Sequence, residues 1–348
     1  MSGIARPLLR WYDGAKRDLP WRRAPSPYKT LVSEFMLQQT VVATVEPYFE
    51  RFLARFPTIA ALAAAGEDEV TALWSGLGYY ARARNLHKAA RAVVERHGGE
   101  LPATEEALRE LPGIGPYTAA AVSAIGFDER AFALDGNGAR VWARLLAVRD
   151  SIDRPATRKA LHARGLDEVP ARRAGDFNQA IMELGATVCT PRAPRCGACP
   201  VAKACGAHAA GDAARIPVRT PKRAKKVVRA ACCACVDTAG RVLLVRRQSG
   251  LLAGTWALPL VELEDEAADR ALGAAVRELG VDTGRLVARG EVRHVFTHRD
   301  VTVEVFRTRA RARRSRDGHA TRRWMAPDAL TDLGISSFTR KTLEAALD

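Results

Sequence analysis

The stretch of sequence that decides the fold is residues 111–122, which read LPGIGPYTAAAV. An expected helix with an acidic start precedes it at residues 104–110, and Pro116 suits the first position of a second helix. Gly113 and Gly115 allow a tight turn between the two. The pattern predicts a helix-hairpin-helix whose exposed backbone N–H groups suit a DNA phosphate, although an ordinary helical turn has the same local signature.

Helical periodicity extends to both sides of this motif. Apolar residues recur at spacings of three and four, and strand-like alternation is scarce. The runs that show this pattern are residues 28–40, 45–56, 69–97 and 177–188. We therefore expect a mainly helical domain over residues 1–210.

The pattern changes after residue 210. Residues 211–228 mix proline with basic residues and have no apolar period, which predicts an exposed, basic linker. Two strands around a turn are expected in residues 231–248, a helix in 266–280 and a period-two strand in 299–310. Residues 229–348 are thus predicted to form a smaller α+β domain.

Composition bounds the classes of protein that remain. The chain has 348 residues, 47% of them hydrophobic, and a net charge of +15. A length of roughly 150 residues per domain predicts two or three domains, and the hydrophobic content excludes a disordered chain. The positive charge favours a polyanionic partner. Because no signal-peptide core and no apolar run of about 20 residues is present, we expect a cytoplasmic protein that does not enter a membrane.

Four of the seven cysteines are grouped at the end of the expected helical domain. They are spaced C-x6-C-x2-C-x5-C, and they are Cys189, Cys196, Cys199 and Cys205. Reduced thiols in the cytoplasm favour ligands over disulfides. Only one of the pairs is as tight as those of structural zinc sites, so the spacing favours an iron–sulfur cluster and leaves zinc as the alternative.

Two acidic residues stand out from their apolar surroundings. Glu34 lies in the run LVSEFML, with Gln38 one turn later on the same helical face, and Asp135 lies in a turn just before an expected helix. A buried glutamate keeps its proton and suits a general acid, whereas an aspartate near helix N–H groups stays ionised. A surface glutamate and an ordinary N-cap aspartate are the simpler alternatives.

Together these motifs resemble the adenine DNA glycosylases of the MutY type, in the helix-hairpin-helix (endonuclease III) superfamily. The resemblance rests on SEFMLQQT, GLGYYARARNLH, LPGIGPYTAAAV, LDGN, FNQAIMELGA and the four-cysteine loop, which occur in the family's order. It covers nearly the whole chain and implies a [4Fe-4S] cluster as cofactor. It also implies a monomer that acts on double-stranded DNA and removes adenine paired with 8-oxoguanine or guanine.

The resemblance assigns roles to residues of the helical domain. It implies that Glu34 protonates the departing adenine and that Asp135 stabilises the oxocarbenium-like sugar. It places Tyr117 and Asn137 as residues that organise this pair. The residues that it implies as contacts to the adenine are Arg22 and Gln179, and those to the DNA strand and the oxidised guanine are Leu37, Gln38, Gln39, Thr40, Tyr79, Gly113 and Gly115. Core packing is the simpler reading of Leu37 and Tyr79.

One position predicts the outcome of the reaction. Relatives that also cut the strand carry a lysine two residues after the second hairpin glycine, and here Tyr117 stands there. Without a lysine amine no Schiff base forms with the sugar, which predicts a monofunctional glycosylase.

The C-terminal domain resembles a Nudix domain that reads the oxidised guanine. Arg277 and Glu278 keep an RE pair, but Gly280 and Val281 lie where metal-binding glutamates are expected, and Leu260 and Val261 replace loop glycines. The missing oxygen ligands predict no hydrolysis. The family's Phe-Ser-His loop is matched by Phe296, Thr297 and His298. Three further cysteines are expected in the core, and they are Cys232, Cys233 and Cys235.

Three other functions remain open from the sequence. The first is a bifunctional, endonuclease III-like glycosylase and lyase. The second is a Nudix-type pyrophosphohydrolase with a DNA-binding extension, and the third is a non-catalytic iron–sulfur protein that binds DNA or senses redox state.

Overall fold

The computed structural model describes residues 3–221, 224–247, 252–312 and 322–348. Contacts divide the chain into two compact units, which are residues 1–64 with 85–222, and residues 65–84 with 223–348. Of the predicted linker, Lys222 and Arg223 lie outside the described residues. The second unit therefore contains a segment of twenty residues from within the predicted helical domain, which local sequence patterns do not indicate.

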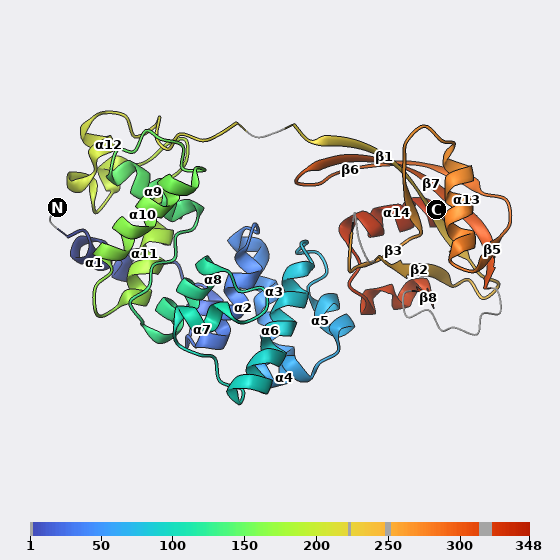
Figure 1. Cartoon of the computed structure of the whole chain (residues 1–348), viewed down its shortest axis with the longest axis horizontal. Helices are drawn as coiled ribbons and strands as arrows, with labels where there is room; N and C mark the ends of the chain where they lie inside the picture. Colours follow the sequence, from blue (N-terminus) through green and yellow to red (C-terminus); the bar gives the residue numbers. More distant parts are fainter. Residues whose placement is uncertain (1–2, 222–223, 248–251, 313–321) are drawn as a thin grey trace. The chain divides into compact units, whose positions relative to one another are not determined.

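The first unit is helical (Figure 1). Its helices are α1 (Ala5–Ala15), η1 (Pro20–Arg22), α2 (Pro27–Leu37), α3 (Val42–Arg55), α4 (Ile59–Ala64), most of α6 (Ala81–His97), α7 (Glu105–Arg109), α8 (Pro116–Ala121), the π-helical η2 (Val122–Gly126), α9 (Gly136–Leu145), α10 (Pro155–Glu168), α11 (Ala174–Thr187), η3 (Cys196–Ala198), η4 (Ala202–Ala204) and α12 (Gly206–Ala209). A large apolar core joins α1, α9 and α11 and includes the fully buried Trp142 and Phe177. This core positions the ends of α9 and α11 that face the candidate site.

The predicted helix-hairpin-helix is present. Thr104 caps α7 by accepting the Ala107 N–H at 3.3 Å, and Pro116 occupies the first turn of α8. Between them Gly113 has a φ of +75°, a left-handed value that favours glycine. A Cβ at Gly113 would also lie 2.4 Å from the side chain of Asn85. Gly115 has an ordinary φ of −86°, so the turn itself requires only the first glycine.

The second unit is an α+β fold. Its elements are α5 (Glu67–Leu73), β1 (Lys226–Val236), β2 (Val242–Arg246), β3 (Trp256–Ala257), β4 (Leu260–Leu263), α13 (Ala268–Glu278), β5 (Val281–Thr283), β6 (Val287–Val295), β7 (Arg299–Ala312), β8 (Arg322–Met325), η5 (Pro327–Asp332) and α14 (Ser337–Leu347). The strand order is β3-β2-β1-β7-β5, with β4 on β1, β6 on β7 and β8 on β2. The central pair β1 and β7 is parallel, and the other pairs are antiparallel.

Two apolar layers hold this sheet. One contains Phe338 and Leu343 of α14, and the other contains Leu272 and Val276 of α13. Alternate residues of β1 serve the two layers, since Cys232 lies in the first whereas Cys233 and Cys235 lie in the second. The expectation that these three cysteines are core residues is confirmed by their complete burial.

The segment predicted as a linker is partly packed against the first unit. Ile216 is buried, and its carbonyl accepts the Arg144 Nε–H at 2.7 Å. The Ile152 N–H donates to the Val218 carbonyl at 3.1 Å. β1 begins at Lys226, before the predicted boundary at residue 229. The boundaries of the domains in solution stay a prediction.

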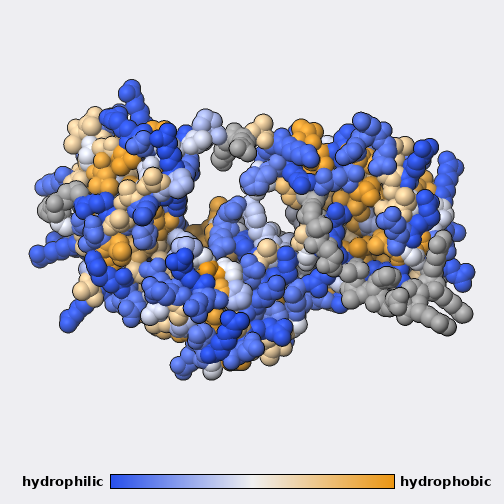
Figure 2. Space-filling view, in the orientation of Figure 1, coloured by the Kyte–Doolittle hydropathy of each residue, from blue (hydrophilic) through white to orange (hydrophobic). Residues whose placement is uncertain are grey.

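Hydrophilic residues cover most of the face shown in Figure 2. Within the described residues, no helix is long and apolar enough to span a membrane.

Candidate active site

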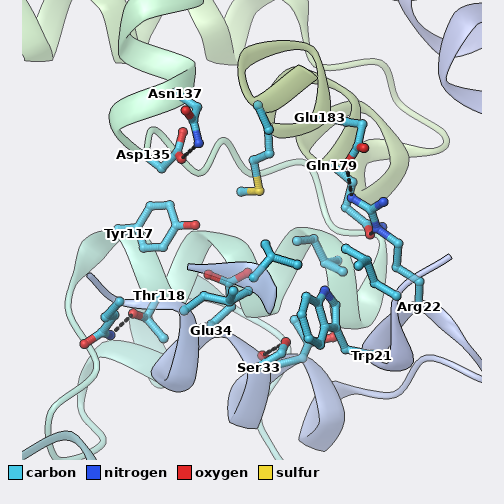
Figure 3. A pocket seen from close by; sticks show the side chains of 18 of the residues that line it. Trp21, Arg22, Ser33, Glu34, Tyr117, Thr118, Asp135, Asn137, Gln179 and Glu183 are labelled. Carbon is cyan, nitrogen blue, oxygen red and sulfur yellow. Dashed lines mark hydrogen bonds and ion pairs between the residues drawn. The ribbon is translucent and has the colours of Figure 1, made fainter. Parts of the chain in front are cut away.

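A cavity of about 1280 Å³ in the first unit gathers most of the residues expected in catalysis (Figure 3). Its walls come from η1, α2, the hairpin and the start of α8, the start of α9, and α11. The expected residues that line it are Arg22, Glu34, Leu37, Gln38, Gln39, Thr40, Gly113, Gly115, Tyr117, Asp135, Asn137 and Gln179. Residues separated by up to 157 positions in the sequence thus share one site.

Glu34 lies in α2 and is 6% exposed. Burial raises the pKa of its carboxyl group to about 7, against which a hydrogen bond with Tyr117 acts, while the charge of Asp135 raises the pKa further. Figure 3 shows Tyr117 between Glu34 and Asp135. A carboxyl group with this pKa holds a proton for much of the time near neutral pH, as a general acid requires.

Asp135 is held in a different environment. It is the N-cap of α9 and accepts the Gly138 N–H at 2.5 Å. Its second oxygen accepts from the Asn137 side-chain amide at 3.0 Å. Asp135 thus lies at the positive end of the helix dipole, with a hydrogen-bond donor on each oxygen. The two acidic residues therefore face one cavity in opposite electrostatic settings.

Asn137 is itself positioned by an arginine. The Arg140 guanidinium donates to the Asn137 side-chain oxygen at 2.7 Å and to the Gly185 carbonyl at 2.7 Å. The same guanidinium donates to the Cys189 carbonyl at 2.8 Å. Arg140 thus connects the start of α9 to the cysteine loop.

The expected adenine contacts lie on the α11 side of the cavity. Arg22 donates through Nε to Gln179 at 3.1 Å and through Nη2 to Glu183 at 2.9 Å, and Arg17 pairs with Glu183 at 2.6 Å. Burial alone would raise the pKa of the Glu183 carboxyl, but the two arginines outweigh it and the pKa is lowered. The cavity therefore contains a buried, ionised carboxylate.

Glu183 was not among the residues expected from the sequence. It lies four positions after Gln179 on α11, which places both on one face of the helix. A glutamate in the apolar run AIMELGA is the local signal that could have indicated it, but its arginine partners are distant in the sequence.

The residues expected to contact the strand lie at the end of α2. The side chain of Gln38 donates to the Thr118 hydroxyl at 3.3 Å, and Gln39 is exposed with a φ of +57°. Leu37 and Thr40 are half-buried at the cavity wall. The simpler interpretation of Leu37 was a residue packed in the core. Its half-buried position shows that it is not fully packed there.

The four cysteines gather in one loop packed against α9. Cys189 accepts a hydrogen bond from the Arg144 guanidinium at 3.2 Å, and Cys205 donates to the Arg144 carbonyl at 3.3 Å. Burial, and to a smaller extent the charges of the other three cysteines, raises the pKa of the Cys199 thiol to about 11. Among the residues that the structure describes, no three such side chains converge on one metal ion. A cubane binds one thiolate at each iron and so does not need them to converge on a point.

The expected recognition loop is the tip of the β6–β7 hairpin in the second unit. The Phe296 N–H donates to the Arg299 carbonyl at 2.8 Å and closes a tight turn that presents Thr297 and His298. The Tyr79 hydroxyl forms a hydrogen bond with the Thr297 hydroxyl, and Tyr79 is 44% exposed. Core packing, the simpler reading of Tyr79, is therefore wrong for this residue.

The positions that metal-binding glutamates would occupy in a Nudix enzyme hold no acidic group. Gly280 follows α13 with a φ of +68°, and Val281 begins β5 and is buried. Leu260 and Val261 lie in β4. No metal-binding cluster of acidic side chains is present in the described part of this unit.

Comparison with known proteins decides the family. Residues 32–164 match the model of the HhH-GPD superfamily of base excision DNA repair proteins, and residues 231–345 match that of the NUDIX domain. Adenine DNA glycosylase from Mus musculus is 36% identical, over 96% of this chain and 76% of its own length. The enzyme from Mycolicibacterium smegmatis is 40% identical, over 82% of this chain and 95% of its own length. The chain belongs to the adenine DNA glycosylase family.

It is thus an N-glycosylase of base excision DNA repair, and the expected fold class is confirmed. The structure of a thermostable thymine-DNA glycosylase is 29% identical, with a TM-score of 0.54 over 60% of this chain and 95% of that chain. An endonuclease III–DNA complex, 22% identical with a TM-score of 0.50, shares the fold of the same part. The non-enzymatic and pyrophosphohydrolase alternatives are not favoured by these relatives.

Proposed function

We propose that this glycosylase removes adenine paired with 8-oxoguanine or guanine in double-stranded DNA. The observation that carries the proposal is the pair of acidic groups in one cavity, a buried Glu34 with a pKa of about 7 and a helix-capped Asp135. An adenine extruded from the duplex would enter this cavity because the reacting atoms are inaccessible within the base stack. The chain would act on chromosomal DNA in the cytoplasm.

The two carboxyl groups divide the work of hydrolysis. Glu34 gives its proton to a ring nitrogen of adenine, so the bond from the sugar C1′ to the base breaks with a neutral leaving group. The sugar acquires oxocarbenium character, which the Asp135 carboxylate stabilises. A water molecule then adds to C1′ and gives a proton back to the Glu34 carboxylate, which restores the acid and leaves an abasic site. Tyr117 and Asn137 hold the two carboxyl groups in place.

The base is held by the polar groups on α11 and η1. The ionised Glu183 and the side-chain amide of Gln179 offer acceptors to an exocyclic amine, and Arg22 offers a donor. A purine with an amino group matches this set. We therefore add Glu183 to the residues that contact adenine.

We propose that the reaction stops at the abasic site. Tyr117 stands where a lysine would form a Schiff base, and its phenol has a pKa well above the ordinary value because it is buried and lies beside Glu34 and Asp135. A phenol does not provide an amine nucleophile, whatever its pKa. At this position the chain therefore has no residue that could form the Schiff base of a bifunctional enzyme.

The four-cysteine loop suits a [4Fe-4S] cluster. Four thiols in one loop, with a buried guanidinium donating to Cys189, fit a ligand set that carries negative charge. Cys189, Cys196, Cys199 and Cys205 would each bind one iron. The cluster would hold the loop folded beside α9, and the hydrolysis itself needs only the carboxyl groups.

The roles of the acidic pair are tested by Glu34→Gln and Asp135→Asn. Each variant keeps the shape of the side chain, so we expect binding of the mispaired duplex with excision reduced about a hundredfold to ten-thousandfold in a single turnover. Asp167→Asn on the exposed surface of α10 is the matched control and should excise normally. Near-normal excision by either active-site variant would remove that residue from its proposed role.

A further inference from the structure

The segment Ala65–Arg84 belongs to the second unit, although about 140 residues of the chain separate it from the rest of that unit. It contains α5, a loop with left-handed glycines at Gly76 and Gly78, and the first turn of α6. Tyr79 lies at the end of this loop with a φ of +50°. The contacts between this segment and the rest of the second unit therefore determine the position of the Tyr79 ring.

The start of α5 is bound through its two acidic residues. Glu67 pairs with Arg246 of β2. Asp68 pairs with Arg323 of β8 at 2.8 Å and accepts the indole N–H of Trp256 at 3.1 Å. The Arg323 guanidinium also lies over the Trp256 ring, 4.7 Å from its centroid. Both acidic groups lie in the first turn of the helix, where negative charge is favourable.

Hydrogen bonds to backbone carbonyls fix the rest of the segment. The hydroxyl groups of Ser75 and Tyr80 both donate to the Ile335 carbonyl, at 2.9 and 2.7 Å. Arg84 donates to the carbonyls of Gly254 and Ala253 at 3.1 and 3.3 Å. These bonds place the loop at both ends.

Tyr79 itself is oriented from within the segment. The buried Arg82 guanidinium lies 5.4 Å from the ring centroids of both Trp74 and Tyr79, and it donates to the Gly78 carbonyl at 3.1 Å. The outer end of the ring reaches Thr297. A single exposed hydrogen bond of this kind contributes too little to order two surface side chains by itself. The bonds of α5 and of the loop must supply the order.

From these contacts we infer that Glu67 and Asp68 are positioning residues for recognition of the base opposite adenine. By anchoring α5 to β2 and β8 they hold Tyr79 against Thr297, so that both side chains meet the oxidised guanine as one surface. This inference rests on the proposed function and adds that recognition depends on an ionic anchor remote from the DNA. Neither acidic residue lines the catalytic cavity.

Reversal of charge tests the anchor. Glu67→Arg and Arg246→Glu each place two like charges together, whereas the double variant restores an opposite pair. We expect each single variant to lower the ratio of single-turnover excision rates, A:8-oxoguanine over A:G, by about two- to tenfold, the effect of losing one hydrogen bond. The A:G rate should stay within about twofold of the unmodified enzyme, and the double variant should regain the ratio. Loss of overall stability would lower both rates alike.

Arg229 and Glu304 provide the matched control, because they form an ion pair at 3.1 Å between β1 and β7 that does not involve residues 65–84. Reversal of either charge there should leave the ratio unchanged. Asp68→Asn should have a smaller effect than the charge reversals, because an amide oxygen still accepts from Trp256.

The outcomes separate this inference from the proposed function. An unmodified enzyme without adenine excision would overturn the proposed function. Normal excision with a ratio that the single reversals leave intact, or that the double variant fails to recover, would overturn the anchor alone.

Discussion

At the scale of single residues, Glu34 and Asp135 show how two identical functional groups acquire different tasks. Glu34 lies in a helix interior among apolar side chains, and burial raises its pKa to about 7. Asp135 caps a helix and receives two hydrogen bonds. The local backbone therefore sets which carboxyl group donates a proton and which stabilises a cation.

The raised pKa of Glu34 predicts how activity changes with pH. A general acid must be protonated in the complex, so the excision rate should fall as the pH rises through about 7, once duplex binding is saturated. Single-turnover rates between pH 5.5 and 9 measure this. A rate that rises steadily through this range would contradict the assignment of Glu34 as the acid.

The same shift predicts an effect on stability. A glutamate with a folded pKa above its unfolded value makes folding less favourable as the pH rises from about 4.5 to 7, by about 3 kcal/mol in total. Glu34→Gln removes this titration. The variant should therefore gain stability relative to the unmodified protein between pH 5 and pH 8 in urea unfolding. An equal difference at both pH values would mean that Glu34 is not buried as described.

Sequence alone indicated part of the site at this scale. Glu34 and Asp135 were found because an acid among apolar residues and an acid before a helix are local signals. Glu183 was missed, although it pairs with Arg17 and Arg22, because the pairing joins residues more than 160 positions apart. No local pattern reports such a contact.

At the scale of elements, the hairpin and the cysteine loop each depend on a few close contacts. The hairpin needs Gly113 for its left-handed φ and for the approach of Asn85. The loop needs Arg144, which is 1% exposed and donates to the carbonyls of Thr190, Pro191 and Ile216. The spacing of the glycines and cysteines predicted both elements. The sequence did not indicate that Arg144 binds the loop, because its partners are distant along the chain.

We expect Gly113→Ala to lower the free energy of unfolding by more than the roughly 1–2 kcal/mol that a left-handed alanine costs, because its Cβ would overlap the Asn85 side chain. Gly115→Ala is the matched control, since a Cβ there meets nothing within 4 Å at an ordinary φ. Urea unfolding of the two variants measures the difference. Equal stabilities would show that the hairpin does not need the left-handed glycine.

The cysteine loop predicts the metal content of the purified protein. A [4Fe-4S] cluster gives about four irons per chain and a brown colour, and Cys199→Ser should lose iron and stability together. Elemental analysis and visible absorption test this, with Cys232→Ser in the sheet core as a variant that should keep its iron. Stoichiometric zinc without iron after anaerobic purification would contradict the cluster.

At the scale of the whole molecule, the order of the sequence and the grouping of contacts differ. A domain boundary near residue 210 follows from the change of periodicity, and the strands and helix predicted after it are present. The membership of residues 65–84 in the second unit depends on bonds to Arg246, Trp256 and Ile335, about 180 to 260 residues away in sequence. Helical periodicity is the same whichever unit a helix packs against.

The net charge of +15 supports DNA as the substrate, because basic side chains neutralise backbone phosphates and release the counterions that were bound to them. If the proposed function is right, this duplex loses one adenine and both of its strands stay intact. The most direct measurement uses the purified protein and a labelled duplex with one adenine opposite 8-oxoguanine. Each sample is divided in two, and strand breakage is measured with alkali treatment in one half and without it in the other. We expect an abasic site that breaks only on alkali treatment. An intact strand after alkali, or a strand already cut without it, would contradict the proposed function.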